Sequence, residues 1–499
     1  MFDGLLLFGQ SIANFSSPST VGLALLASLV GVVMGALPGL TATMALALMT
    51  TLTLKLPPSQ ALLILICTYV GSIYGGSRSA ILLNIPGTPA SAASCLDGYT
   101  LARQGLAGRA MGIATTGSVM GTLIGMFFLA TLTPVLGGLA LKFGAYEFFW
   151  LALFGVIIAG TLTGDDPLKG WIAGIAGLFV ATIGQEPQYG YERFAWGLRD
   201  LAGGIQLVPA LVGAFGFAEL LTSMRARQAP VTISAFDTVI PKLRDVFQYW
   251  RTILRSGLIG TGVGIVPGVG EDVAAWSSYA AAKRASQEKE KFGKGSVEGL
   301  MAAETGDNAC VPGAMIPVLT LAIPGSAPAA VLMAAMIIHG VKPGPMIMVE
   351  SPQFVYDVVA MMLFATIGIL IYGLVLTKAL VQVLRVPQHL IVPIIFVLCA
   401  VGSFAIAGRL FDIYVMLAFG LIGFALRHHG YPMAPLVLGI VLGDLLEKNL
   451  RRALILSDGD LTPFFTRPIA AAVAALIFAT IAWRVWSLVR PSRAGRAPA

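Results

Sequence analysis

Residues 31–49 read GVVMGALPGLTATMALALM, and residues 260–278 read GTGVGIVPGVGEDVAAWSS. Each stretch is apolar and carries a proline followed by a glycine at the same place, 229 positions apart. Proline lacks a backbone donor and glycine is a poor helix former, so the pair predicts a break in each apolar segment. A second pair of breaks follows in the same order, in LLNIPGTPASA (82–92) and TLAIPGSAPAA (320–330), 238 positions apart. The recurrence predicts an internal repeat with a small insertion in its second copy.

The composition places these breaks inside a membrane protein. Of the 499 residues, 57% are hydrophobic and 11% are charged, whereas soluble domains carry about 25% charged residues. Apolar stretches long enough to cross a bilayer recur along the chain, and roughly ten to twelve of them are expected to be membrane segments. We therefore expect an all-α polytopic membrane protein in contact with a lipid bilayer.

Charge and short motifs exclude several other classes. The net charge is +7, but the basic residues lie in loops between spans, which favours an orientation signal over nucleic-acid binding. The four isolated cysteines predict neither a disulfide nor a metal cluster, and no P-loop is present. No nucleophile–base set is visible in the spans, so we expect no enzyme activity and no bound cofactor.

The repeat also predicts how the chain is organised. We expect an interfacial segment over 1–20, a first transmembrane repeat over 21–224 and a cytoplasmic linker over 225–255. A second transmembrane repeat is expected over 256–490, followed by a basic tail over 491–499.

Loop charges predict the orientation of the two copies. The loop KLPPSQ (55–60) has one basic residue, while its counterpart KRASQEKEKFGKG (283–295) has five. Basic loops stay in the cytoplasm, so equivalent loops are expected on opposite sides of the membrane, as in an inverted repeat. Each proline–glycine segment is then either a re-entrant hairpin or a broken full span, and charge leaves both open.

Helix breaks in a membrane are candidate binding sites. Their freed backbone groups survive only where they face protein or a wet cavity. Freed N–H groups favour an anion and freed carbonyls favour a cation. Four breaks paired by repeat predict one central substrate site, although a proline kink with glycine packing is the alternative at each. The predicted substrate-binding residues at the breaks are Gly35, Pro38, Gly39, Thr41, Pro86, Gly87, Thr88, Pro267, Gly268, Pro324, Gly325 and Ser326.

The stretch YGGSRSAILLNIPG (74–87) places Ser77, Arg78 and Asn84 in an apolar segment. An arginine at membrane depth is costly and usually meets an acid or a ligand. We predict that Arg78 binds a substrate carboxylate through its forked guanidinium, with Ser77 and Asn84 beside it. Snorkelling to the interface or pairing with a structural acid is the alternative.

Acidic residues near the second copy of the breaks are candidates for cation coupling. Glu271 and Asp272 follow the second proline–glycine pair, and Glu304, Asp307 and Asn308 open the next apolar segment. Oxygen ligands suit hard cations, and intramembrane acids carry protons, so Na⁺ or a proton is the expected coupling ion. Solvated loop acids at the cytoplasmic face are the alternative.

Several long motifs occur together in one order: GALPGLT, YGGSRSAILLNIPGTPASAASCLDGY, PGVGEDVAAWSSYAAAKR, AIPGSAPAAVLMAAMIIHGVKPGP and PLVLGIVLGDLLEKNLRRAL. Together they resemble the large membrane subunit of tripartite tricarboxylate transporters. The resemblance implies a multi-pass protein of the bacterial inner membrane that imports carboxylates with a cation gradient. It also implies two partners, a small membrane subunit and a periplasmic solute-binding protein.

One departure from that family concerns the candidate cation site. The family has an acid–Ser–Ala–Asn–Asn run where this chain has ETGDN (304–308), which places an acid where the family has an amide.

We predict a secondary active transporter for di- or tricarboxylates that works by alternating access. A passive organic-anion channel on a similar fold is the alternative.

Overall fold

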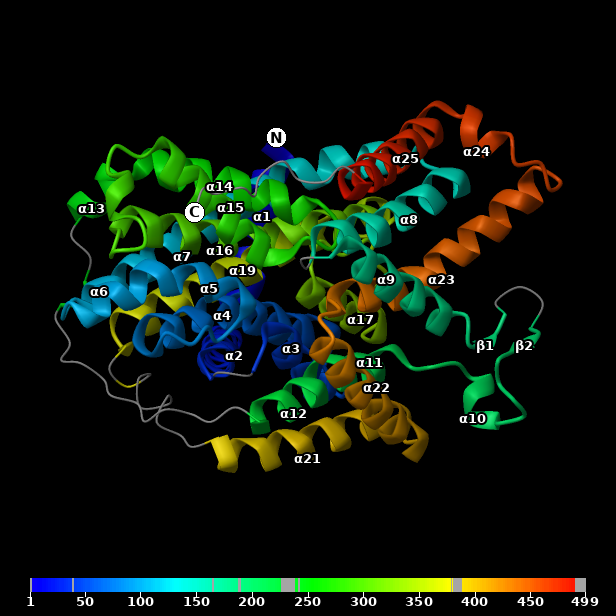
Figure 1. Cartoon of the computed structure of the whole chain (residues 1–499), viewed down its shortest axis with the longest axis horizontal. Coiled ribbons are helices and arrows are strands. Elements are labelled where there is room, and N and C mark those ends of the chain that lie inside the picture. The colour runs from blue at the N-terminus through cyan, green and yellow to red at the C-terminus, as the bar shows by residue number, and fades with distance from the viewer. Residues whose placement is uncertain are drawn as a thin grey trace, which may run out of the picture. The chain divides into compact units, whose positions relative to one another are not determined.

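The computed structural model describes residues 2–37, 40–163, 166–186, 190–225, 238–240, 243–377, 379 and 388–489. Pro38, Gly39, much of the expected linker and the expected basic tail lie outside these residues. Six described helices are long and apolar enough to cross a membrane, which confirms an all-α membrane protein. They are α2 (Pro18–Ala36), α4 (Pro58–Leu83), α7 (Ala107–Ala140), α8 (Ala145–Leu162), α19 (Gln353–Leu374) and α22 (Leu410–His428) (Figure 1).

Other helices complete the described chain. The longer ones are α1 (Phe2–Phe15), α3 (Ala42–Thr53), α9 (Pro167–Ala181), α14 (Trp250–Ile265), α15 (Gly270–Ala285), α16 (Val297–Leu321), α17 (Ala327–Ile338), α21 (Gln388–Ala407), α23 (Met433–Leu456) and α25 (Pro468–Val489). The short ones are η1 (Pro89–Ser91), α5 (Ala92–Ser94), η2 (Cys95–Tyr99), α6 (Thr100–Arg103), α10 (Arg199–Ala202), α11 (Leu207–Leu211), η3 (Val212–Phe217), α12 (Ala218–Arg225), α13 (Leu243–Gln248), η4 (Lys289–Lys291), α18 (Ile347–Glu350) and α24 (Pro463–Thr466). Strands β1 (Gly184–Gln185) and β2 (Glu192–Arg193) pair antiparallel.

The chain forms two compact units. The larger unit contains residues 1–141 and 205–429, and the smaller unit contains residues 142–204 and 430–499. Compact units and sequence repeats are different divisions of a chain, so the predicted domain boundaries stay a prediction. The candidate site lies wholly in the larger unit.

Ion pairs hold the smaller unit together. Arg467 Nε lies 2.7 Å from Glu147 Oε1 and joins the turn between α24 and α25 to α8. Glu447 accepts hydrogen bonds from both Arg193 and Arg451, which connects β2 to α23. Charges near the end of α23 are thereby paired inside the unit.

Within the larger unit, the two repeat copies adopt the same succession of elements. The residue that caps the end of α2 is Leu37, with φ −78° and ψ 114°, and the residue that caps the end of α14, 229 positions later, is Val266, with φ −78° and ψ 121°. Another helix follows each break, α3 with 12 residues in the first copy and α15 with 16 in the second. The long helices α4 and α16 then end in left-handed residues, Asn84 with φ 57° and Ala322 with φ 56°, which are 238 positions apart.

Close helix packing also occurs at equivalent positions. Helix α2 packs along α4, and α14 packs along α16. A Cβ added to Gly31 would lie 2.5 Å from the carbonyl oxygen of Thr68, and one added to Gly260 would lie 2.1 Å from that of Gly306. Small residues let helix backbones approach this closely. The close contact of Gly35 with the Ser72 carbonyl oxygen likewise corresponds to that of Gly264 with the Cys310 carbonyl oxygen. The contact of Gly87 with Gly35 corresponds to that of Gly325 with Gly264.

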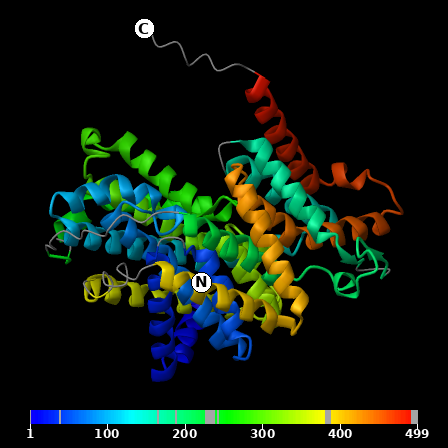
Figure 2. The same cartoon turned by 60° about the horizontal axis from the view of Figure 1, so that its bottom comes forward.

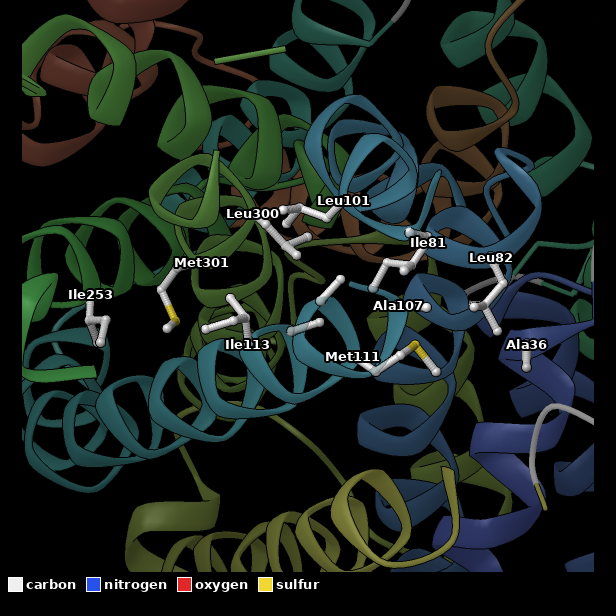
Figure 3. Close-up of a cluster of buried hydrophobic side chains, with 13 residues drawn as sticks. Ala36, Ile81, Leu82, Leu101, Ala107, Met111, Ile113, Ile253, Leu300 and Met301 are labelled. Carbon is white, nitrogen blue, oxygen red and sulfur yellow. The ribbon is translucent and has the colours of Figure 1, made fainter. Parts of the chain in front are cut away.

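The two copies pack against each other. Helix α16 of the second copy contacts both α7 and α4, and α14 also contacts α7. Helices α14 and α16 lie beside α7, and α16 also lies beside α4 (Figure 1, Figure 2). Side chains at the end of α4 and the start of α7 and α16, including Ile81, Met111 and Leu300, form one buried apolar cluster with Ile253 of α14 (Figure 3). This cluster fixes the helices that carry the candidate site.

Candidate functional site

The second proline–glycine break is fully described. Helix α14 ends at Ile265 and α15 begins at Gly270. Gly268 takes φ +72°, a left-handed conformation that glycine adopts without strain. Its N–H donates to the carbonyl oxygen of Pro324, 3.2 Å away, so this break touches the IPG segment of the same copy. Pro267 is partly buried beside it.

The first copy has the same arrangement around its described residues. Gly87 lies against Gly35, because a Cβ on Gly87 would be 2.2 Å from the Gly35 carbonyl oxygen. Thr41 begins α3 and accepts the N–H of Met44 through its hydroxyl, 3.3 Å away. The IPG segment of the first copy therefore packs against the end of α2 at Gly35, as that of the second copy packs against the end of α14 at Gly264.

The IPG segments each lead into a helix start. Ser326 begins α17 and accepts the N–H of Ala329, 3.3 Å away. Thr88 begins η1 and is buried, but its Oγ1 has no hydrogen-bond partner. Asn84 and Pro86 are exposed at the end of α4, where Asn84 supplies the left-handed turn.

Glu304 lies at the centre of a buried hydroxyl cage. Its Oε2 accepts hydrogen bonds from Ser77 at 2.6 Å and Ser118 at 3.0 Å, and its Oε1 accepts one from Ser94. The donors come from α4, α7 and α5, and all four side chains are buried. Three hydroxyl donors satisfy the oxygens of this carboxyl group, so Glu304 is held in one position between the two copies.

Arg78 is buried beside this cage. It is 1% exposed, its guanidinium stacks 4.3 Å from the ring centre of Tyr74, and Nη1 donates to the Met111 carbonyl oxygen at 3.5 Å. Its Nε and Nη2 have no hydrogen-bond partner within the described chain. Arg78 interacts electrostatically with Glu304 but forms none of the ion pairs found among the described residues. Unpaired donors on a buried guanidinium are costly, so this edge is suited to a ligand carboxylate.

Asp307 and Asn308 extend the same cluster along α16. The Asn308 amide donates to Asp307 Oδ1 at 2.7 Å and to Ser118 Oγ at 3.0 Å. Both side chains are fully buried, yet Asp307 Oδ2 and Asn308 Oδ1 have no partner in the described structure. The arrangement leaves free oxygen acceptors beside the Glu304 cage.

Glu271 belongs to a second cluster that joins the two copies. Its carboxylate accepts a hydrogen bond from the hydroxyl of Tyr69 on α4. The same hydroxyl lies 2.8 Å from Ser326 Oγ at the start of α17. Asp272, the next residue, is only partly buried.

The structure thus brings Ser77, Arg78, Glu304, Asp307 and Asn308 into one cluster, and Glu271 and Ser326 into another. Sequence reasoning missed the residues that complete them, which are Tyr69, Ser94 and Ser118. Tyr69 lies in an apolar run and Ser118 on a ridge of glycines, so neither stands out by composition. A usable signal existed for Tyr69, because it is 238 positions before Asp307 and therefore its repeat equivalent.

Asp97 was also missed, and its contacts are structural. Its Oδ1 accepts the N–H groups of Gly293, Gly295 and Ser296 at 2.7–2.9 Å, and its Oδ2 accepts the Tyr279 hydroxyl at 2.8 Å. The loop between α15 and α16 is thereby tied to the first copy. This contact holds the helix that carries Glu304 and Asp307.

Comparisons with known proteins agree with the sequence motifs. A sequence model of the Tripartite tricarboxylate transporter TctA family matches residues 21–438. An Agrobacterium vitis protein described as "Uncharacterized 52.8 kDa protein in TAR-I ttuC' 3'region" is 35% identical over 466 residues, 93% of this chain and 93% of that protein. A second protein of that organism, "Uncharacterized protein in TAR-II ttuC' 3'region", is 36% identical over 217 residues, 44% of this chain and 90% of that protein. No solved structure matches the chain.

Proposed function

Because the chain belongs to the tripartite tricarboxylate transporter TctA family, we propose that it imports di- or tricarboxylates, or related organic anions, by secondary active transport. Family membership makes it a subunit of a tripartite tricarboxylate transporter, and its apolar helices make it a multi-pass membrane protein. We place it in the bacterial inner membrane as the permease subunit. Its proposed partners are a small membrane subunit and a periplasmic solute-binding protein that delivers the substrate.

The observation that carries the substrate assignment is the buried, partly unpartnered guanidinium of Arg78. Its free Nε and Nη2 edge matches the two oxygens of a carboxylate, and bidentate pairs of this kind are strong and specific. The helix starts at Thr41, Thr88 and Ser326 would add backbone N–H groups for further carboxylates. A substrate with two or three carboxylates fits such a donor set.

Charge supports coupling to a cation. The two buried clusters contain three acids, Glu271, Glu304 and Asp307, against one guanidinium. An anionic substrate would meet a net negative interior unless Na⁺ or a proton entered with it. A passive anion channel has no use for buried acids beside its path, so this inventory favours symport over that alternative.

The repeat supports alternating access. Two copies with the same packing meet at the clusters, and the unequal basic content of the equivalent loops KLPPSQ and KRASQEKEKFGKG favours opposite orientations. In an inverted repeat the two copies can exchange conformations, which opens the shared site to each side in turn. We propose this mechanism for the chain.

Uptake in proteoliposomes tests the proposal. The vesicles contain both membrane subunits, the solute-binding protein is added outside, and accumulation of a labelled tricarboxylate is followed under an imposed Na⁺ or H⁺ gradient. We expect accumulation above equilibrium only with binding protein and one of the gradients. Uptake that equilibrates equally without any gradient would support the channel instead.

The role of Arg78 is tested in the same assay. Arg78→Lys keeps the positive charge but cannot form two parallel hydrogen bonds to one carboxylate, so we expect the KM for substrate to rise about tenfold. Arg103→Lys, at an exposed arginine at the end of α6, is the matched control and should leave the KM unchanged. Equal KM values for the two variants would remove Arg78 from the substrate site.

A further inference from the structure

The repeat pairs the residues of the two buried clusters with one another. Tyr69 and Asp307 are 238 positions apart, and so are Thr88 and Ser326. Helix α4 contacts α17 in the way that α16 contacts η1. By the same correspondence, the repeat equivalent of the Tyr69–Ser326 pair is the pair of Asp307 and Thr88. These two positions are called here the tyrosine station (Tyr69 and Ser326) and the aspartate station (Asp307 and Thr88).

The tyrosine station is closed by its own hydrogen bonds. The Tyr69 hydroxyl lies 2.8 Å from Ser326 Oγ and also donates to Glu271. Each polar atom there has a protein partner, and the aromatic ring fills the space that a short side chain would leave. None of the side-chain oxygens of Tyr69, Ser326 and Glu271 is among the buried atoms that have no hydrogen-bond partner in the described structure.

The aspartate station has the opposite property. Asp307 is 0% exposed and Thr88 is 2% exposed, yet Asp307 Oδ2 and Thr88 Oγ1 both have no partner in the described structure. Asn308 Oδ1, on the adjacent residue, is also buried and unpartnered. Where Glu271 closes the tyrosine station, the equivalent residue 229 positions earlier is Ala42, which has no polar side chain. Buried oxygens without partners are costly, and one station holds several of them.

We propose that the aspartate station binds one monovalent hard cation, Na⁺, with Asp307 Oδ2 and Thr88 Oγ1 among its ligands, whereas the tyrosine station binds none. The proposal rests on the function proposed above and names the place of its coupling ion. A carboxylate and a hydroxyl are hard oxygen ligands. Thr88 also follows a helix break, where freed carbonyls can complete the coordination.

The donor set fits Na⁺ better than a transition metal or a divalent ion. Within the described residues, no group of three or more His, Cys, Asp or Glu side chains could hold a metal ion. One carboxylate at the station balances one positive charge, which is what a buried site needs in order to stay neutral. Calcium sites in proteins gather more carboxylates and carbonyls than this.

The position of the station links the cation to the substrate. Asn308 bonds to both Asp307 and Ser118, and Ser118 donates to Glu304 in the cage beside Arg78. A cation on Asp307 would neutralise one of the two acids in this network before a carboxylate arrives. The expected order is therefore Na⁺ first and substrate second.

The test measures Na⁺ binding by the purified full chain, without transport. Thermal unfolding in detergent is followed while NaCl replaces KCl at constant ionic strength, and ²²Na⁺ binding is measured in parallel. We expect Na⁺ to raise the melting temperature of the wild-type chain, since a ligand that binds only the folded state stabilises it. Asp307→Asn and Thr88→Val should each weaken Na⁺ affinity by about tenfold or more, and Thr88→Ser should restore it.

Matched controls separate this loss from misfolding. Asp444→Asn, at an exposed acid paired with Lys448, and Thr116→Val, at a hydroxyl bonded only within α7, should keep wild-type Na⁺ affinity. Melting in KCl alone should be unchanged by Thr88→Ser, which shows that its fold is intact. The proposal is overturned if the wild-type chain shows no Na⁺ response, or if Asp307→Asn keeps it while Tyr69→Phe loses it.

This outcome is independent of the uptake assay. Na⁺ binding that disappears in Asp307→Asn, together with uptake that ignores both the Na⁺ and the H⁺ gradient, would refute secondary transport and leave the site standing. Gradient-driven uptake together with Na⁺ binding unaffected by Asp307→Asn and Thr88→Val would support secondary transport and refute the Na⁺ site at the aspartate station.

Discussion

Gly260 and Gly262 lie two residues apart in α14 and meet different surroundings. A Cβ on Gly260 would lie 2.1 Å from the carbonyl oxygen of Gly306 on α16, while one on Gly262 would meet nothing within 4 Å. Alanine at either position adds the same methyl group to the same helix. The change in helix propensity, about 0.5–1 kcal/mol in favour of alanine, is common to both variants and cancels in their difference.

The remaining difference is the cost of the clash. Ordinary contact begins at 3.4 Å, so α14 and α16 would have to separate by roughly 1.3 Å locally to admit the methyl group of Gly260→Ala. The obstructing atom belongs to a helix backbone, which cannot turn aside as a flexible side chain can. Overpacking of this kind costs about 1–3 kcal/mol, and we expect the upper end of that range. Gly260→Ala should therefore be about 3 kcal/mol less stable than Gly262→Ala.

Reversible unfolding of the purified chain in detergent micelles, by heat or by SDS titration, measures the difference. The repeat adds an internal check, because Gly31→Ala in α2 meets Thr68 at 2.5 Å and should be destabilised in the same direction. Equal free energies of unfolding for Gly260→Ala and Gly262→Ala would refute the close packing of α14 on α16.

Three further predictions concern other parts of the larger unit. Asp97→Asn should destabilise the chain by about 3 kcal/mol, because charge-assisted hydrogen bonds to three backbone N–H groups are weakened. Amide hydrogen exchange over residues 286–296 should also accelerate. Exchange there as slow as in the exposed-site control Asp460→Asn would contradict this prediction. Glu304→Gln should reduce uptake by at least about tenfold while the melting temperature changes little, and uptake at the wild-type rate would show that the cage charge is dispensable. Cys67, Cys310 and Cys399 are buried and should resist maleimide in the folded chain, whereas rapid labelling of all three would contradict the described packing.

Much of the fold follows from sequence patterns. The proline–glycine pairs and the offsets of 229 and 238 positions predict helix ends that the structure reproduces to the residue at Leu37 and Val266. They succeed because a missing donor and a flexible backbone act locally, whatever the tertiary context. The apolar composition predicts membrane helices for the same reason, since hydrocarbon constrains every segment independently.

The candidate site was only partly predictable. Arg78 and Glu304 stand out because charges are rare in apolar runs, but the serines that surround Glu304 come from three helices and are unremarkable in each. Tyr69 reads as an ordinary core residue until its repeat equivalence to Asp307 is noticed. Partners that are distant in sequence depend on helix packing, and the periodicity of one segment does not specify which face meets which neighbour.

The opposite orientation of the two copies is the central claim, since the shared site and alternating access both depend on it. Single cysteines at two exposed positions in equivalent regions, Ser59→Cys in the first turn of α4 and Glu290→Cys in η4 before α16, report it directly in a chain whose native cysteines are replaced by alanine. A membrane-impermeant maleimide is applied to intact cells and then to permeabilised cells. The account predicts that Ser59→Cys reacts in intact cells and that Glu290→Cys reacts only after permeabilisation. Labelling of both cysteines under the same condition would contradict an inverted repeat.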